Sequence, residues 1–196
     1  MSSERSRVSG LETEHDDLRR FAVLLLVFSG QPRIADRTQI QKLAYIVNEC
    51  GWHAISDYRF IARGPNSQWL DSQLDTWRDA GIVNEVEESI LIGTDSEVGF
   101  FCYSLTDKGL SFAKSVLDSV NEPQLVDKTL RYIFKLSKYT EQELEIVSSI
   151  LYVHRETGLD LKNIVKRILL FRPDFREEEI RKHLDILEYA RDNVTF

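Results

Sequence analysis

Long apolar runs, cysteine and proline are all scarce in this chain of 196 residues, which contains two cysteines and four prolines. The longest apolar run, residues 21–28, is less than half of the ~20 residues that a membrane-spanning helix needs. No basic segment with a small-residue cleavage site precedes that run, so a secretory signal is not indicated. We therefore expect a soluble, cytoplasmic protein that does not contact a membrane.

The chain also lacks the residue patterns of catalysis and of metal binding. It contains no glycine-rich phosphate loop, no GxSxG nucleophile elbow and no HExxH metal motif. Cys50 and His53 are close in sequence, but they straddle a predicted helix end at Gly51 and have no second pair of ligands. With Cys102 far away, we expect two buried, reduced thiols. The prediction is a non-catalytic protein, without metal or cofactor, that acts by binding.

Acidic residues are concentrated in the middle of the chain. Residues 65–121 carry ten acidic and three basic side chains, a net charge of −7 that equals the formal net charge of the whole protein. The segments before and after are close to neutral. Any binding surface built from the middle segment is therefore expected to be acidic.

The first part of the chain predicts two helices and a short strand. Apolar residues recur at helical spacing over residues 16–30 and 38–50. Thr38 and Gln41 have the spacing of a capping box at the start of the second helix. Alternating apolar residues at 58–63 predict a strand, which we expect to pair with a hairpin later in the chain.

A turn, a helix and that hairpin follow. The segment Gly64-Pro65-Asn66-Ser67 is expected to turn the chain into a third helix, residues 68–80, with Asn66 or Ser67 as the N-cap. Residues 82–92 and 101–105 predict a two-stranded hairpin, the wing. Three apolar side chains at helical spacing define the buried stripe of the third helix: Leu70, Leu74 and Trp77.

Four segments from this part of the chain are distinctive: QIQKLAYIVNE, YRFIARGPNS, QWLDSQLDTWRDAGIV and YSLTDKG. Together they resemble the winged-helix domains of the YwgA-like and Panacea (SocA-type antitoxin) families over about residues 18–120. The resemblance implies a role in gene regulation, or as an adaptor that binds other proteins. It supplies no catalytic residues.

We therefore predict a mainly α protein with a small antiparallel β wing, in which a winged helix-turn-helix precedes an all-helical C-terminal extension. The expected parts are a flexible polar tail at 1–15, a winged-helix domain at 16–121 and a helical region at 122–196. Breaks in the last region divide it into four short helices. Their expected N-caps include Thr140, Asp160 and Asp174.

The surface of the third helix is the first candidate binding site. In a winged helix this element reads the DNA major groove, but acidic side chains here and along the wing would repel phosphates. Trp69 is expected to stand partly exposed, as interface tryptophans often do, or to cover the edge of the core. The candidate residues are Asn66, Gln68, Trp69, Ser72, Asp75, Arg78 and Asp79.

A basic stripe after Pro123 is the second candidate. Lys128, Arg131, Lys135 and Lys138 fall on one face of a predicted helix. The stripe can be a solvated helix face, a site for a nucleic-acid backbone, or a site for the acidic wing of a second copy.

The leading functional hypothesis is a prokaryotic regulatory protein of transcription-factor type, whose DNA contacts come from the basic stripe and flanking Arg residues. The alternative is an antitoxin-like or adaptor module whose acidic third helix and wing bind a basic protein. Apolar stripes in residues 117–133 exceed what one small domain can cover, so we also expect a homodimer built from the C-terminal helices.

Overall fold

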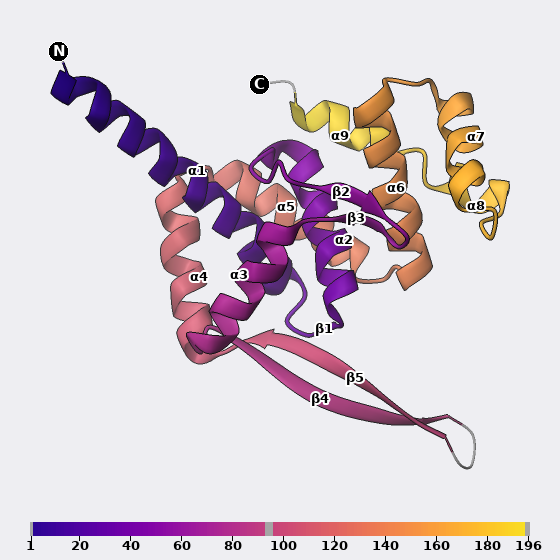
Figure 1. The fold of residues 1–196 in the computed structure, drawn as a ribbon, viewed down its shortest axis with the longest axis horizontal. Helices are drawn as coiled ribbons and strands as arrows, with labels where there is room; N and C mark the ends of the chain where they lie inside the picture. The colour runs from indigo at the N-terminus through magenta and orange to yellow at the C-terminus, as the bar shows by residue number, and fades with distance from the viewer. Residues whose placement is uncertain (1, 93–95, 195–196) are drawn as a thin grey trace.

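The chain folds into a mainly helical body from which a β-hairpin projects (Figure 1). The computed structural model describes the backbone of residues 2–92 and 96–194 and the side chains of residues 16–91 and 97–190. The helices are α1 (Ser2–Gly30), α2 (Arg37–Val47), α3 (Gln68–Asp79), α4 (Asp107–Val120), α5 (Pro123–Leu136), α6 (Glu141–Thr157), α7 (Leu161–Phe171), α8 (Glu177–Lys182) and α9 (Ile186–Val194), with a π-helical turn η1 (Asn48–Trp52). The strands are β1 (Ile34–Ala35), β2 (Arg59–Ile61), β3 (Gly64–Asn66), β4 (Val83–Ile92) and β5 (Ser96–Leu105). None of these helices combines the length and the apolar character needed to cross a lipid bilayer.

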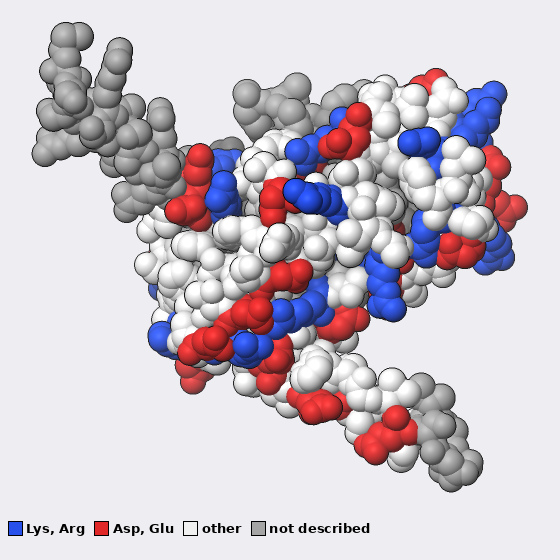
Figure 2. Space-filling view, viewed as in Figure 1, with Lys and Arg blue, Asp and Glu red and all other residues white. Residues whose placement is uncertain are grey.

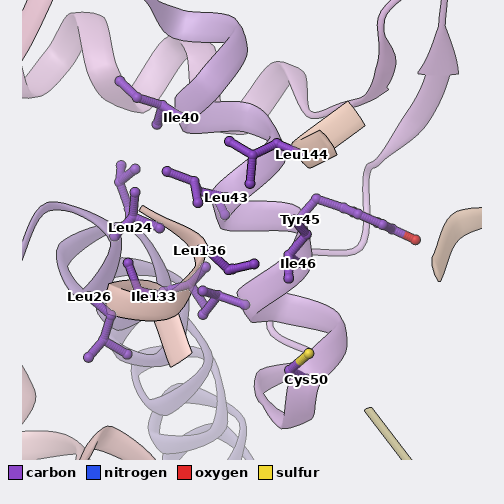
Figure 3. Close-up of a cluster of buried hydrophobic side chains, with 14 of the residues drawn as sticks. Leu24, Leu26, Ile40, Leu43, Tyr45, Ile46, Cys50, Ile133, Leu136 and Leu144 are labelled. Atoms are coloured by element: carbon purple, nitrogen blue, oxygen red, sulfur yellow. The ribbon is translucent and has the colours of Figure 1, made fainter. Parts of the chain in front are cut away.

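Helix α1 is the centre of the body. Residues 22–27 are all 0% exposed, so this part of the helix is buried on every side. It packs against α2, α4 and α5. Figure 3 shows Leu24 and Leu26 of α1 close to Ile133 and Leu136 of α5. Core residues from both sides of residue 122 form one cluster.

The start of α1 differs from the expectation. The sequence predicts a polar tail at 1–15 and a helix from about Asp16, whereas α1 begins at Ser2. No proline interrupts residues 2–15, and extending an existing helix is far easier than nucleating a new one. The helix therefore continues through a segment that has no apolar stripe of its own.

The apolar stripe of residues 117–133, from which a homodimer was expected, is covered within one molecule. Ile133 is 0% and Val120 5% exposed, while Leu117, Leu125 and other partly buried residues pack against the core. The approach to α1 is close, since a Cβ added at Gly30 would lie 2.7 Å from Ile133 Cγ2. The apolar surface from which a homodimer was inferred is therefore used inside one copy.

The main sheet has the strand order β1-β5-β4 and is antiparallel throughout. Strand β1 pairs with the base of β5 through Ile34 opposite Tyr103. Strands β4 and β5 pair from Val83 opposite Leu105 outward to their tips. We call this β4–β5 hairpin the β-arm, and Figure 1 shows it extending away from the body.

The expected pairing of the strand near Tyr58 with the hairpin is wrong. Strand β2 pairs instead with β3 in a separate two-stranded sheet, with Phe60 opposite Pro65. Gly64 has φ 103°, a conformation that strongly favours glycine. It lets the chain reverse directly after β2, so the Gly64-Pro65-Asn66 segment forms a strand, and β1 takes the place beside β5.

The start of α3 is anchored to α2 by Gln41. Ser67 is the N-cap of α3, as one of the two expected alternatives, and its hydroxyl accepts the Leu70 amide. The Gln41 side chain donates to the Ser67 carbonyl and accepts the Ser67 amide, both at 2.9 Å. The expected capping box of Thr38 and Gln41 is wrong, because Asp36 caps α2 and Gln41 points to Ser67.

The YSLTDKG segment joins the β-arm to α4. The Thr106 hydroxyl accepts the Gly109 amide and donates to the Gly81 carbonyl at 2.7 Å. A Cβ at Gly109 would lie 2.1 Å from the Ile82 carbonyl oxygen. Only glycine permits this approach, so the motif has a structural role at the base of the arm.

A buried ion cluster joins α2 to the C-terminal helices. Lys42 is 0% exposed, and its Nζ lies 3.3 Å from Glu141 and 3.8 Å from Glu145. Glu145 in turn pairs with Arg172 at the end of α7. Burial lowers the pKa of Lys42, and the carboxylates of Glu141 and Asp36 oppose that shift.

Most of the C-terminal caps follow the sequence. The capping box of Thr140 and Glu143 is confirmed, and Asp160 caps α7. Arg176 rather than Asp174 is the N-cap of α8. The four expected helices are α5, α6, α7 and a last segment that the structure divides into α8 and α9, with His183 ending α8.

Candidate binding surfaces

The predicted third-helix surface lies on α3, apart from Asn66 at the end of β3, and Figure 1 shows α3 toward the viewer. Gln68, Ser72, Arg78 and Asp79 are exposed, whereas Asn66, Trp69 and Asp75 are partly buried. The buried stripe of Leu70, Leu74 and Trp77 is confirmed.

Trp69 is a packing residue more than an interface residue. Its ring stacks on Phe21 of α1 with centroids 6.3 Å apart, and the Arg20 guanidinium lies 5.9 Å from the ring centroid. Its backbone amide donates to Asp57. Trp69 therefore covers the edge of the core, where it is partly exposed as expected.

An arginine from outside α3 neutralises part of the acidic surface. Arg37, the first residue of α2, contacts Asp75 at 2.6 Å and Glu85 of β4 at 3.1 Å. Arg78 lies 3.2 Å from Asp75 and 3.4 Å from Glu85. Arg37 also donates to the Tyr103 hydroxyl at 3.0 Å. Arg37 and Arg78 thus link α2, α3 and the base of the β-arm.

The contacts of this cluster shift the pKa values of its carboxyl groups. A hydrogen bond from Arg37 holds the pKa of Asp75 below its usual value. The Tyr103 hydroxyl, followed by Arg37, lowers the pKa of Glu85. The pKa of Arg37 is raised, mainly by Asp75. No local sequence spacing indicates Arg37, because it lies far from Asp75 and Glu85 along the chain.

The β-arm keeps its acidic character. Figure 2 shows red and blue side chains intermixed on the body above the arm, whereas the arm in this view carries red side chains and no blue. Arg33 pairs with Glu88 near the base. Glu87 and Glu97 have no basic partner among the described side chains.

Large apolar side chains are also exposed on the arm. Strand pairing places Val86, Ile90 and Val98 on one face and Leu91 and Phe101 on the other, because residues opposite each other share a face. Their exposed fractions run from 42% for Val86 to 76% for Leu91. Isolated two-stranded hairpins are marginally stable in water. Exposed apolar area of this kind is common at interaction surfaces.

Two hollows accompany these surfaces. One, of about 450 Å³, lies on the arm around Ser89 and Gly99 and is lined by Glu87, Glu88 and Glu97. The other, of about 400 Å³, lies between the start of α2, the β2–β3 hairpin and the start of α3. Its polar lining comes from Arg37, Thr38, Gln41, Arg63, Asn66 and Asp71.

The predicted basic stripe is exposed on α5 and the turn after it. Lys128, Arg131 and Lys135 lie on α5, and Lys138 lies just beyond its end at Leu136. Arg131 pairs with Asp127 at 2.5 Å, whereas Lys135 has no acidic partner among the described residues. Phe134 stands among these cations with 65% of its surface exposed, a feature that the charge pattern alone does not reveal.

The stripe and the α3 surface do not form one site. In Figure 1, α5 runs behind α2, while α3 and the β-arm lie toward the viewer. Helix α5 packs against α1, α2 and α4. The molecule therefore has a predominantly acidic surface and a basic surface on separate parts of the body.

Other chemistry-bearing residues are dispersed. Cys50 and Cys102 are free and buried, as expected. Within the described side chains, no group of three or more His, Cys, Asp or Glu residues is placed to hold a metal ion.

Comparison with known proteins finds no protein-family model that matches the chain and no curated protein with significant similarity to it.

Proposed function

We propose that this protein is a non-catalytic regulatory protein of the winged-helix type. The order α1-β1-α2-α3-β4-β5, with β1 beside β5, supports this assignment, since a winged helix combines three helices with a short strand and a two-stranded wing. In this assignment the β-arm is the wing, α3 is the third helix, and the β2–β3 hairpin is an insertion between α2 and α3.

The proposed activity is to bind a basic protein partner through the β-arm and α3. One observation carries this proposal: the arm projects from the body with exposed apolar side chains beside Glu87 and Glu97, which have no basic partner among the described side chains. Exposed apolar area rimmed by charge is typical of protein interfaces. The carboxylates would select a cationic partner and accelerate its association.

The same surface is unfavourable for nucleic acid. Phosphates are attracted by Lys and Arg, and this attraction supplies essentially all non-specific affinity. Arg37 and Arg78 are occupied by Asp75 and Glu85, and the outer arm carries uncompensated acid. Major-groove reading by α3 is therefore not the function that we propose.

A second candidate is DNA-associated transcriptional regulation through the basic stripe. Its specific support is the exposure of Lys128, Arg131, Lys135 and Lys138 together. Each phosphate contact of such a stripe would contribute about 0.9 to the slope of log K against log salt. This candidate depends on the basic stripe and not on the β-arm.

The test measures binding of a lysine-rich peptide and of duplex DNA of random sequence. Reversing Glu87 and Glu97 to Lys should abolish peptide binding. The matched control, Asp118→Lys/Glu178→Lys, makes the same change in net charge at exposed positions off the arm and should bind the peptide as wild type does. Equal binding by both variants would reject the arm as the binding surface.

For the second candidate, Lys135→Glu/Lys138→Glu should weaken DNA binding and flatten its salt dependence by roughly two units of slope. Lys162→Glu/Lys166→Glu on α7 is the matched control. DNA binding that is absent at low salt in the wild type would exclude this candidate.

A further inference from the structure

One face of the β-arm has an ordered pattern of acid, gap and apolar side chain. Glu87 lies opposite Phe101, Ser89 opposite Gly99, and Leu91 opposite Glu97. Opposite residues share a face, and alternate pairs along the strands lie on the same side. We call these six residues the acid face. Its centre, at Ser89 and Gly99, has no large side chain and forms the floor of the hollow on the arm.

The basic stripe has the complementary pattern. Arg131, Phe134 and Lys138 are spaced by three and four residues, so they follow one side of α5 and its C-terminal turn. Phe134 is 65% exposed between the two cations. The basic stripe thus presents an exposed phenylalanine among cations, and the acid face presents a hollow among carboxylates.

The spacings of the two patterns are similar. Glu97 lies opposite Leu91, which is four positions from Glu87 along β4. The backbone positions of the two glutamates are therefore about 13 Å apart along the strands. Arg131 and Lys138 are seven positions apart, or about 10 Å at helical rise. The backbone spacings of the two patterns are therefore comparable.

The β-arm does not lie where it could contact the basic stripe of its own chain. Strand β1 fixes the base of β5 to the body, and Figure 1 shows the arm leading away while α5 runs behind α2. The complementary surfaces therefore call for two molecules.

We propose that the acid face of each β-arm binds the basic stripe of a second copy, in a reciprocal two-fold dimer. The proposal rests on the proposed function of the arm as a protein-binding surface and names its partner. Charge complementarity and the exposed Phe101, Leu91 and Phe134 carry it. A two-fold arrangement uses each contact twice and closes the assembly. This dimer differs from the one expected from the C-terminal apolar stripe, which is buried within one copy.

The test is a charge-swap experiment followed by sedimentation velocity. The wing variant is Glu87→Lys/Glu97→Lys, and the stripe variant is Arg131→Glu/Lys138→Glu. Wild type should dimerise with rising concentration, and salt should weaken the dimer because exposed charges are screened. Each variant alone should dissociate at least about tenfold more readily. An equimolar mixture should restore dimers, since the reversed arm of one variant meets the reversed stripe of the other, and the unreversed pair also remains complementary.

The mixture separates a specific contact from a general loss of folding. Circular dichroism of each variant checks the fold, and Glu87→Gln/Glu97→Gln provides a neutral version of the wing variant. Wild type that stays monomeric, single variants that dimerise like wild type, or a mixture that fails to recover would overturn the proposal. If wild type stays monomeric yet its arm binds the lysine-rich peptide, the self-association fails and the proposed function stands. If neither self-association nor peptide binding is observed, both the dimer and the proposed function are rejected.

Discussion

The side-chain amide of Gln41 makes two hydrogen bonds to the backbone of Ser67, donating to its carbonyl and accepting its amide, each at 2.9 Å. Gln41 is 3% and Ser67 0% exposed. A residue of α2 thus pairs with the N-cap of α3 as a neighbouring strand would, and this contact sets where α3 begins relative to α2.

Replacing Gln41 by Leu should destabilise the protein by about 2 kcal/mol or more, because two buried backbone groups lose their partners. Urea unfolding monitored by circular dichroism measures the change. The control is Gln124→Leu at an exposed position of α5, where surface substitutions usually change stability by less than about 0.5 kcal/mol. Equal stability of the two variants would show that the Gln41 contact contributes little.

Gly109→Ala should strongly lower the melting temperature. The new Cβ would lie 2.1 Å from the Ile82 carbonyl oxygen, which is backbone and cannot rotate away. Gly99→Ala on the β-arm is the matched control, since its nearest neighbour would be a side-chain oxygen at 3.6 Å. A normal melting temperature for Gly109→Ala would contradict the close approach of α4 to the arm.

Arg37→Met should raise the pKa of Asp75 and of Glu85, because both carboxylates lose a cationic hydrogen-bond donor. NMR titration of the side-chain carboxyl carbons measures the two pKa values. Arg63→Met, at an exposed position in the turn between β2 and β3, should leave them unchanged.

The stability difference between wild type and Arg37→Met should depend on pH. The folded pKa values of both carboxyl groups lie below their ordinary values of 3.8 and 4.5. Their ionised forms therefore stabilise the fold above that range, and the contribution is lost as the pH falls through the folded pKa. A difference in melting temperature that grows on acidification would contradict this assignment.

Glu143→Gln tests the capping box of α6. The Thr140 amide, followed by Lys182, lowers the pKa of Glu143 from 4.5 to about 2. The wild-type advantage should be complete above pH 4.5 and disappear as the pH approaches 2. Thermal unfolding across this range measures it. Glu178→Gln on α8, an exposed glutamate that caps no helix, should show no comparable loss.

Several features of the fold were predicted from short stretches of sequence. The spacing of Leu70, Leu74 and Trp77 indicated the buried side of α3, and the capping box of Thr140 and Glu143 indicated the start of α6. These features depend on residues within one or two helical turns, so local periodicity and capping chemistry are sufficient to find them.

Pairings between distant segments were less predictable. The strand after Tyr58 was assigned to the hairpin, but β1 occupies that place, and Gly64 allows β2 to pair with the adjacent β3. Gln41 has the spacing of a capping residue, yet it pairs with Ser67. For both β2 and Gln41, two local arrangements were compatible with the sequence. Contacts within the complete folded body decided which arrangement formed.

The candidate surfaces show the same division. The sequence by itself determined that the middle segment is acidic, that α5 carries a row of cations, and that the apolar stripes of the helices need a core. Only the tertiary structure placed Arg37 against Asp75 and Glu85 and left Phe134 exposed among the cations. It also buried the apolar stripe of α5 against α1 and separated the acidic arm from the basic stripe. Charge and periodicity are properties of neighbouring residues, whereas neutralisation and burial depend on which distant segments meet when the core closes.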